Sequence, residues 1–122
     1  MAKILIAEDD DAIRTLVVRA LSQDGHILTA AANGRAALDA LSEQDDEFDL
    51  LLTDVKMPIM DGITLALTAG REHPDLAILM MTGFADQRER AHELDAFVHD
   101  VINKPFTLKQ IQGAVQEALA RR

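Results

Sequence analysis

Short apolar runs alternate along this chain with longer segments in which apolar residues recur at helical spacing. The runs lie near residues 4–7, 26–31, 50–53, 78–81 and 98–102, and a helical period follows each of them. Continuous apolar runs are typical of parallel strands that are buried on both faces. The alternation therefore predicts five strand–helix units joined by right-handed crossovers, which is an α/β fold built on a parallel sheet.

Residues that favour the ends of helices bound most of the predicted elements. They are Asp10 or Asp11 before the first helix and Gly25 after it, the Asn33-Gly34 turn before the second, Asp61-Gly62 and His73-Pro74 around the third, and the Thr107/Gln110 capping box of the last. Residues 86–93 predict a helix that is charged or polar nearly all round, so we expect it to be loosely packed and mobile. The acidic run 43–47 predicts a solvated loop.

Charged or reactive residues follow four of the predicted strands. They are Glu8 with Asp9, Asp54, Thr82 and Lys104. Ligands of open parallel sheets bind outside the carboxyl ends of the strands, so we expect these side chains to meet in one crevice. A single polar residue where a strand meets solvent is common, but four that converge are not expected by chance. The four positions together predict a functional site.

Two or three carboxylates in one crevice repel one another, and a hard divalent cation relieves that repulsion. Carboxylate and carbonyl oxygens with room for water suit Mg²⁺, which is commonly bound together with phosphate. An aspartate can itself form an aspartyl phosphate, and phosphoryl transfer needs cations around the transferred group. We interpret Asp54 as the nucleophile, with Mg²⁺ and Lys104 as the cations. Thr82 is then a hydroxyl donor to the phosphoryl group, and Gly83 leaves space beside it.

Composition narrows the classes of function. A length of 122 residues suits one domain, and no apolar run approaches the roughly 20 residues that a membrane span requires. Nothing resembles a signal peptide, so we expect a cytoplasmic protein. The formal net charge of -9 opposes binding to nucleic acid or to an anionic membrane. Because cysteine is absent, disulfides and cysteine metal sites are excluded.

Four motifs carry a resemblance to a known family. They are Glu8-Asp9-Asp10, Asp54-Val55-Lys56-Met57-Pro58-Ile59-Met60-Asp61-Gly62, Thr82-Gly83 and Lys104-Pro105-Phe106. In this order, across the whole chain, they resemble the receiver domain of two-component response regulators. The resemblance implies a doubly wound, CheY-like and flavodoxin-like (βα)5 three-layer sandwich with the parallel sheet order 2-1-3-4-5. It further implies a single receiver domain over residues 1–122, without an output domain.

The resemblance also implies a role for each site residue. Asp54 would accept the phosphoryl group from a histidine kinase or a histidine phosphotransferase. Lys104 would contact that group, and Thr82 would be the hydroxyl that switches. The implied Mg²⁺ ligands are Asp9 and Asp54 directly, Glu8 through water, and the main-chain carbonyl of Lys56. The peptide bond between Lys104 and Pro105 would be cis.

The sequence departs from the usual receiver pattern at two places, and these departures point to a subgroup of the family. Val101 occupies a position that is commonly aromatic, and residues 93–100 lack the Gly-Ala pair that often precedes the fifth strand. We therefore expect the switch to reorder residues 83–94 around Thr82 without an aromatic relay. Residues 93–100, taken together with residues 81–91, make the chain similar to the single-domain CpdR-type receivers of alphaproteobacteria. In that subfamily the unphosphorylated form docks on the ClpX/ClpXP protease and primes proteolysis, and phosphorylation turns this off.

Three classes of function remain open on these residues. The first is a receiver that binds partners, the second is a phosphate shuttle or sink in a phosphorelay, and the third is an aspartyl-phosphate phosphohydrolase. Phosphatases similar to haloacid dehalogenase need an aspartate two residues after the nucleophile, and Lys56 stands there. We therefore expect a protein that takes phosphoryl groups from donors and loses them again, but that is not a dedicated enzyme.

Overall fold

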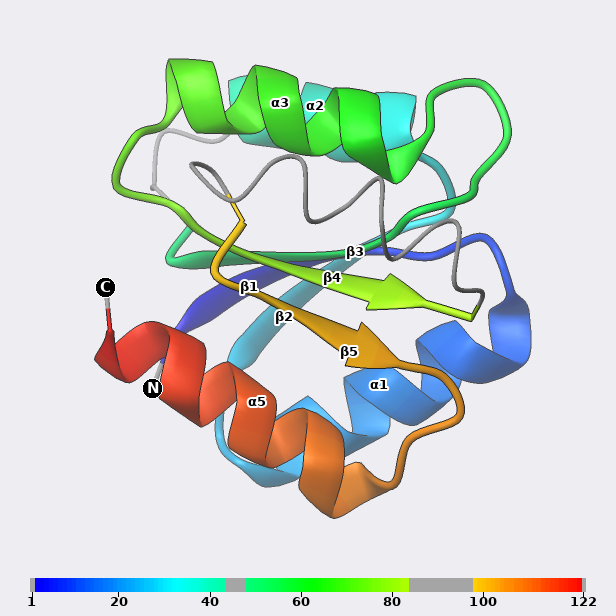
Figure 1. Cartoon of the computed structure of the whole chain (residues 1–122), viewed down its shortest axis with the longest axis vertical. Coiled ribbons are helices and arrows are strands. Elements are labelled where there is room, and N and C mark those ends of the chain that lie inside the picture. Colours follow the sequence, from blue (N-terminus) through cyan, green and yellow to red (C-terminus); the bar gives the residue numbers. More distant parts are fainter. Residues whose placement is uncertain (1, 44–47, 84–97, 122) are drawn as a thin grey trace.

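Five parallel strands form one sheet in the computed structural model, which describes residues 2–43, 48–83 and 98–121 (Figure 1). The strands are β1 (Lys3–Ala7), β2 (Ile27–Ala31), β3 (Leu50–Asp54), β4 (Ala77–Thr82) and β5 (Asp100–Asn103). Their order across the sheet is β2-β1-β3-β4-β5, and every neighbouring pair is parallel. The expected fold class and strand order are confirmed.

Four described helices cover the two faces of the sheet. They are α1 (Asp11–Gln23), α2 (Gly34–Glu43), α3 (Gly62–Glu72) and α5 (Leu108–Ala120). Figure 1 shows α2 and α3 on one face and α1 and α5 on the other, which makes three layers. The helix expected over residues 86–93 and most of the acidic run 43–47 lie outside the described residues.

Successive residues of the central strands face opposite helix layers, which is the period of two expected of a strand. Leu5 and Leu51 belong to the apolar cluster shared with α2 and α3, whereas Ile4, Ile6 and Leu52 belong to the cluster shared with α1 and α5. All five side chains are fully buried. Burial on both faces explains why these strands are continuous apolar runs in the sequence.

The predicted helix ends are confirmed by local hydrogen bonds. Asp10 and Asp61 are the N-caps of α1 and α3, and Thr107 forms a capping box with Gln110 at the start of α5. Gly25, at φ 82°, follows the end of α1 in the left-handed region that glycine tolerates best. The peptide bond between Lys104 and Pro105 is cis, as the resemblance implied.

The loop between β3 and α3 contains an unusual turn at Ile59. This β-branched residue has φ 71°, and its side chain is 81% exposed. The Met60 N–H donates to the Pro58 carbonyl at 2.8 Å, so the turn closes over three residues. A positive φ at a β-branched residue is strained, and the exposed side chain recovers little of that cost by packing.

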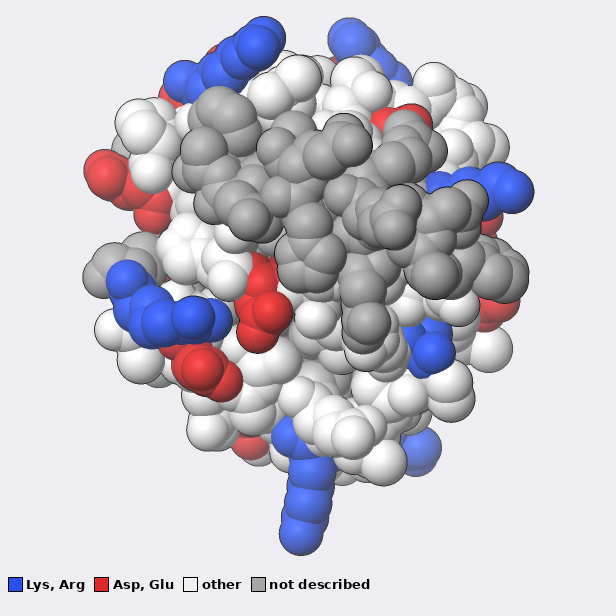
Figure 2. Space-filling model, in the orientation of Figure 1, with Lys and Arg blue, Asp and Glu red and all other residues white. Residues whose placement is uncertain are grey.

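Charged side chains of both signs lie on the face of the molecule seen in Figure 2. On the face seen in Figure 2, the acidic and basic residues that the structure describes are interspersed. Within the described ranges, no helix has both the length and the apolar character needed to cross a membrane.

Candidate functional site

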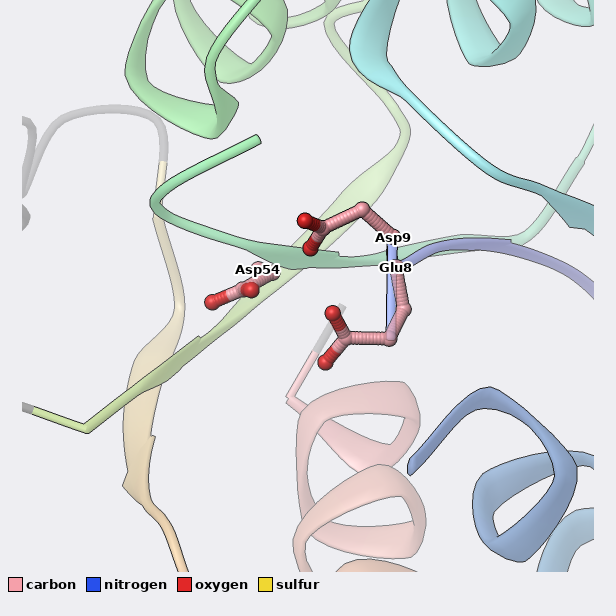
Figure 3. A group of neighbouring side chains, drawn as sticks. All are labelled: Glu8, Asp9 and Asp54. Atoms are coloured by element: carbon pink, nitrogen blue, oxygen red, sulfur yellow. The ribbon is translucent and has the colours of Figure 1, made fainter. Parts of the chain in front are cut away.

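The carboxyl ends of β1 and β3 bring three carboxylates together. Glu8 and Asp9 directly follow β1, and Asp54 is the last residue of β3. The two strands are hydrogen-bonded neighbours in which Ala7 pairs with Thr53, so the acids leave the sheet side by side. One carboxylate oxygen from each residue lies within 4.8 Å of the others. Figure 3 shows the three carboxyl groups directed into the same space.

A cavity of about 350 Å³ opens over these carboxylates. Its lining residues are Glu8, Asp9, Asp10, Ile13, Asp54, Lys56, Gly83 and Lys104. They come from the ends of several strands and from the first turn of α1, which is where open parallel sheets bind ligands. Asp10 and Ile13 were not expected to line it from the sequence, because a cap residue and an apolar helix position carry no signal for a crevice.

Lys104 reaches this site from the loop after β5. Its Nζ atom lies 2.7 Å from Glu8 Oε1 and 3.1 Å from Asp54 Oδ2. Burial disfavours the charged ammonium group, but the hydrogen bonds to Glu8 and Asp54 outweigh burial and raise the pKa of Lys104 above its ordinary 10.5. The lysine is therefore a permanent cation between two carboxylates.

The two acids after β1 both have a raised pKa. Glu8 is fully buried, and burial is the largest cause that raises its pKa, although the hydrogen bond from Lys104 opposes it. Burial and the neighbouring Glu8 carboxylate also raise the pKa of Asp9. Both shifts favour protonation, which a bound cation would replace.

Backbone hydrogen bonds hold the Asp54 side chain and the loop that follows it. Its Oδ1 atom accepts from the Val55 N–H at 2.8 Å, and the Val55 carbonyl accepts from the Gly62 N–H at 2.7 Å. A Cβ atom at Gly62 would lie 1.8 Å from the Asp54 carbonyl oxygen, so only glycine permits this approach. The sequence indicated Gly62 only as a helix start, because its contact with Asp54 depends on the folded loop.

The other expected site residues lie around this centre. Lys56 is exposed and lines the cavity, as does Gly83. Thr82 is 1% exposed at the end of β4, directly before Gly83, and its carbonyl accepts from the Lys104 N–H at 2.8 Å. Thr82 is not among the residues that line the cavity. Val101 is partly buried in β5 and packs against the apolar cluster shared with α2 and α3.

The donor set fits a hard divalent cation. Three carboxylates offer oxygen ligands, one of them is fully buried, and the cavity beside them leaves space for water. Mg²⁺ takes oxygen ligands, needs few carboxylates and keeps several of its waters. The residues present therefore suit Mg²⁺ at the position that the sequence indicated.

The chain matches a known protein family over most of its length. The family profile for the response regulator receiver domain matches residues 4–116. The chain belongs to this family. The receiver is similar to two solved structures of the same CheY-like fold. A receiver domain protein from Clostridium thermocellum has a TM-score of 0.89 at 25% identity, covering 99% of this chain and 96% of that one. The chemotaxis response regulator CheY4 of Vibrio cholerae has a TM-score of 0.86 at 27% identity, covering 97% and 98%.

Curated relatives differ in how much of their length the receiver spans. It is 40% identical to the response regulator receiver protein CpdR of Brucella abortus (strain 2308), and the match covers 98% of both chains. It is 36% identical to the sensor kinase CckA of the same organism but spans 13% of it. It is 34% identical to the response regulator MprA of Mycolicibacterium vanbaalenii and spans 51% of it. The likeness to CpdR therefore extends over a whole protein.

Proposed function

We propose that this receiver is a phosphorylation-controlled switch in the cytoplasm, in which Asp54 accepts a phosphoryl group from a phosphohistidine of a histidine kinase or histidine phosphotransferase. In the transfer, the bond between the histidine nitrogen and phosphorus breaks and a bond forms from an Asp54 oxygen to phosphorus. The leaving imidazole takes a proton from solvent. Asp54 is suited to the attack because its other carboxylate oxygen is held by the Val55 N–H.

Cations around the transferred group lower the barrier to this transfer. Asp9, Asp54 and the Lys56 carbonyl would hold Mg²⁺ directly and Glu8 would hold it through water, and the ion would supply positive charge to the phosphoryl oxygens. Lys104 Nζ, at 3.1 Å from Asp54 Oδ2, would supply a second positive charge from the protein itself. The buried Thr82 hydroxyl at the end of β4 would then donate to the phosphoryl group and report its presence.

The observation that carries this proposal is the position of the Lys104 ammonium group. It contacts both Glu8 and Asp54 beside the three-carboxylate group, so a nucleophile, a permanent cation and oxygen ligands for a second cation share one cavity. Phosphoryl transfer needs mainly alignment and charge neutralisation from a protein, and this cavity provides both.

Acetyl phosphate with Mg²⁺ tests the phosphoacceptor directly. We expect the intact mass of the wild type to rise by one phosphoryl group, and Asp54→Asn to remain unlabelled. Asp61→Asn is the matched control, because it removes one carboxylate while asparagine still caps α3. Equal labelling of wild type and Asp54→Asn would contradict the assignment.

For the output, we propose an adaptor of the CpdR type that binds ClpX and primes ClpXP proteolysis in its unphosphorylated state. The support is the 40% identity to a CpdR over 98% of both chains. The test measures binding of purified ClpX to the receiver with and without Mg²⁺ and beryllium fluoride, which mimics the aspartyl phosphate. We expect the mimic to weaken binding to the wild type and to leave Asp54→Ala unchanged.

A phosphate shuttle or sink is the second candidate. It is favoured by the 36% identity to a segment of the sensor kinase CckA, because a similar domain within a kinase lies on the donor side of a signalling chain. Rapid phosphoryl exchange with a histidine phosphotransferase, without any binding to ClpX, would support it. A phosphohydrolase is disfavoured, because Lys56 stands where such enzymes need an aspartate as general acid.

A further inference from the structure

The turn between β1 and α1 carries two of the three carboxylates and is folded by its own polar groups. The Asp10 side chain accepts from the N–H groups of Ala12 and Ile13 at 2.9 Å and 3.0 Å, which begins α1. The Asp10 N–H donates to Glu8 Oε2 at 3.2 Å. These bonds order the helix start and the Glu8 carboxylate, but none of them is made to the Asp9 side chain.

Arg14 makes a contact that reaches back into this turn. Its Nη1 atom donates to the main-chain carbonyl of Glu8 at 2.9 Å, and its Nη2 atom pairs with Asp11. The Arg14 side chain is 24% exposed, against 89% for Asp11. The guanidinium group therefore lies against the turn, with its orientation set by one neutral and one charged acceptor.

The carbonyl of Glu8 belongs to the peptide unit that joins Glu8 to Asp9. Because that unit is planar, a hydrogen bond to its oxygen also fixes the direction in which the Asp9 main chain leaves it. Asp9 is exposed, whereas Glu8 is fully buried and bonded to Lys104. The Asp9 carboxylate has hydrogen bonds to the Glu8 side chain and to its own main chain, both within this turn. Its direction thus depends on the turn that Arg14 holds.

We infer that Arg14 is a positioning residue, which aims the Asp9 carboxylate at the divalent cation through the Glu8–Asp9 peptide. This inference rests on the proposed function, because it needs Mg²⁺ to bind the three-carboxylate group. Arg14 does not line the cavity, so its effect on the cation is carried by the peptide and not by direct contact.

The alternative effect of Arg14, its charge, predicts the opposite sign. A guanidinium group near a cation site repels the cation, so its removal would tighten Mg²⁺ binding if charge alone mattered. If Arg14 positions Asp9, its removal weakens binding, and residues that orient metal ligands typically change metal affinity by about 10- to 100-fold. The direction of the change therefore separates the two explanations.

The experiment titrates Mg²⁺ into the metal-free receiver by calorimetry. We expect the order of affinity to be wild type, then Arg14→Lys, then Arg14→Met, with about a 10-fold loss for Arg14→Met. Lysine keeps a donor for the Glu8 carbonyl and restores part of the affinity, although it cannot also hold Asp11 as the planar guanidinium does. Arg35→Met is the control, because it removes a cation and an exposed ion pair with Asp39 on α2.

Each outcome decides the inference. An Arg14→Met affinity equal to or tighter than that of wild type overturns the positioning role and leaves the proposed function intact. A wild type that does not bind Mg²⁺ overturns the proposed function, and the inference falls with it. Far-UV circular dichroism of the metal-free variants shows that they are folded at the titration temperature. If Arg14→Met is unfolded there, the Mg²⁺ affinity of Arg14→Lys decides in the same way. A weaker affinity than that of wild type supports the positioning role, and an equal or tighter one overturns it.

Discussion

Neutralising Asp9 should stabilise the metal-free receiver and abolish its response to Mg²⁺. Asp9→Asn keeps the size of the side chain and removes one of three negative charges whose oxygens lie within 4.8 Å of one another. At 4.8 Å, two like charges repel by about 0.9 kcal/mol in water and by about 3.5 kcal/mol at an effective dielectric of about 20. Since Asp9 is exposed, the lower value applies to each of its two carboxylate neighbours.

Attraction to the nearby Lys104 offsets part of this repulsion, so the expected gain in the free energy of unfolding is about 1 kcal/mol. For a domain of 122 residues, this corresponds to a rise of about 4 °C in the melting temperature. Mg²⁺ at a hundredfold excess over its dissociation constant should stabilise the wild type by about 2.7 kcal/mol, or about 10 °C. Asp9→Asn should lack this second increase.

Thermal melts followed by circular dichroism, in chelator and in Mg²⁺, measure both effects. Asp61→Asn removes a carboxylate outside the cavity lining and should behave as the wild type does in both conditions. Melting curves of the wild type that are indifferent to Mg²⁺ would refute the cation site. An Asp9→Asn variant that still responds fully would show that Asp9 is not a ligand.

Three further predictions concern the loop at Ile59, the contact of His99 with β4, and the switch. Ile59→Gly should raise the free energy of unfolding by about 1 kcal/mol, because it relieves about 1–3 kcal/mol of backbone strain and costs only about 0.5–1 kcal/mol of chain entropy. A lower melting temperature of the variant would contradict this. Burial, and then the charge of Arg121, lower the pKa of His99, whose Nδ1 atom accepts from the Ile78 N–H at 3.2 Å. Because the unfolded chain then binds more protons, the wild type should lose stability relative to His99→Asn as the pH falls below about 6.5. Denaturant melts of both proteins measure this, and a difference in their free energies of unfolding that does not change with pH would refute it. Thr82→Ala should leave phosphorylation intact but reduce the change in hydrogen exchange that beryllium fluoride and Mg²⁺ cause across residues 83–94. If that change in exchange is as large in the variant as in the wild type, Thr82 is not the switch hydroxyl.

Much of the fold, and which strand ends gather at the candidate site, could be predicted from the sequence, because the signals involved are local. The continuous apolar runs of β3 and β4 are a direct consequence of burial on both faces, and caps such as Asp61 act within four residues. The position of Asp54 at a strand end follows from the same runs. Parallel topology then places such ends at one edge of the sheet.

Only the tertiary structure decided which of these residues touch. Lys104 reaches Glu8 across 96 positions of the chain, and Gly62 approaches the Asp54 carbonyl so closely that no side chain fits between them. The contact of Arg14 with the Glu8 carbonyl and the positive φ of Ile59 are likewise absent from any sequence pattern. Sequence periodicity reports which face of an element is buried. The distances within the site depend instead on strand register and loop closure, which form only when the whole sheet and its helices are packed.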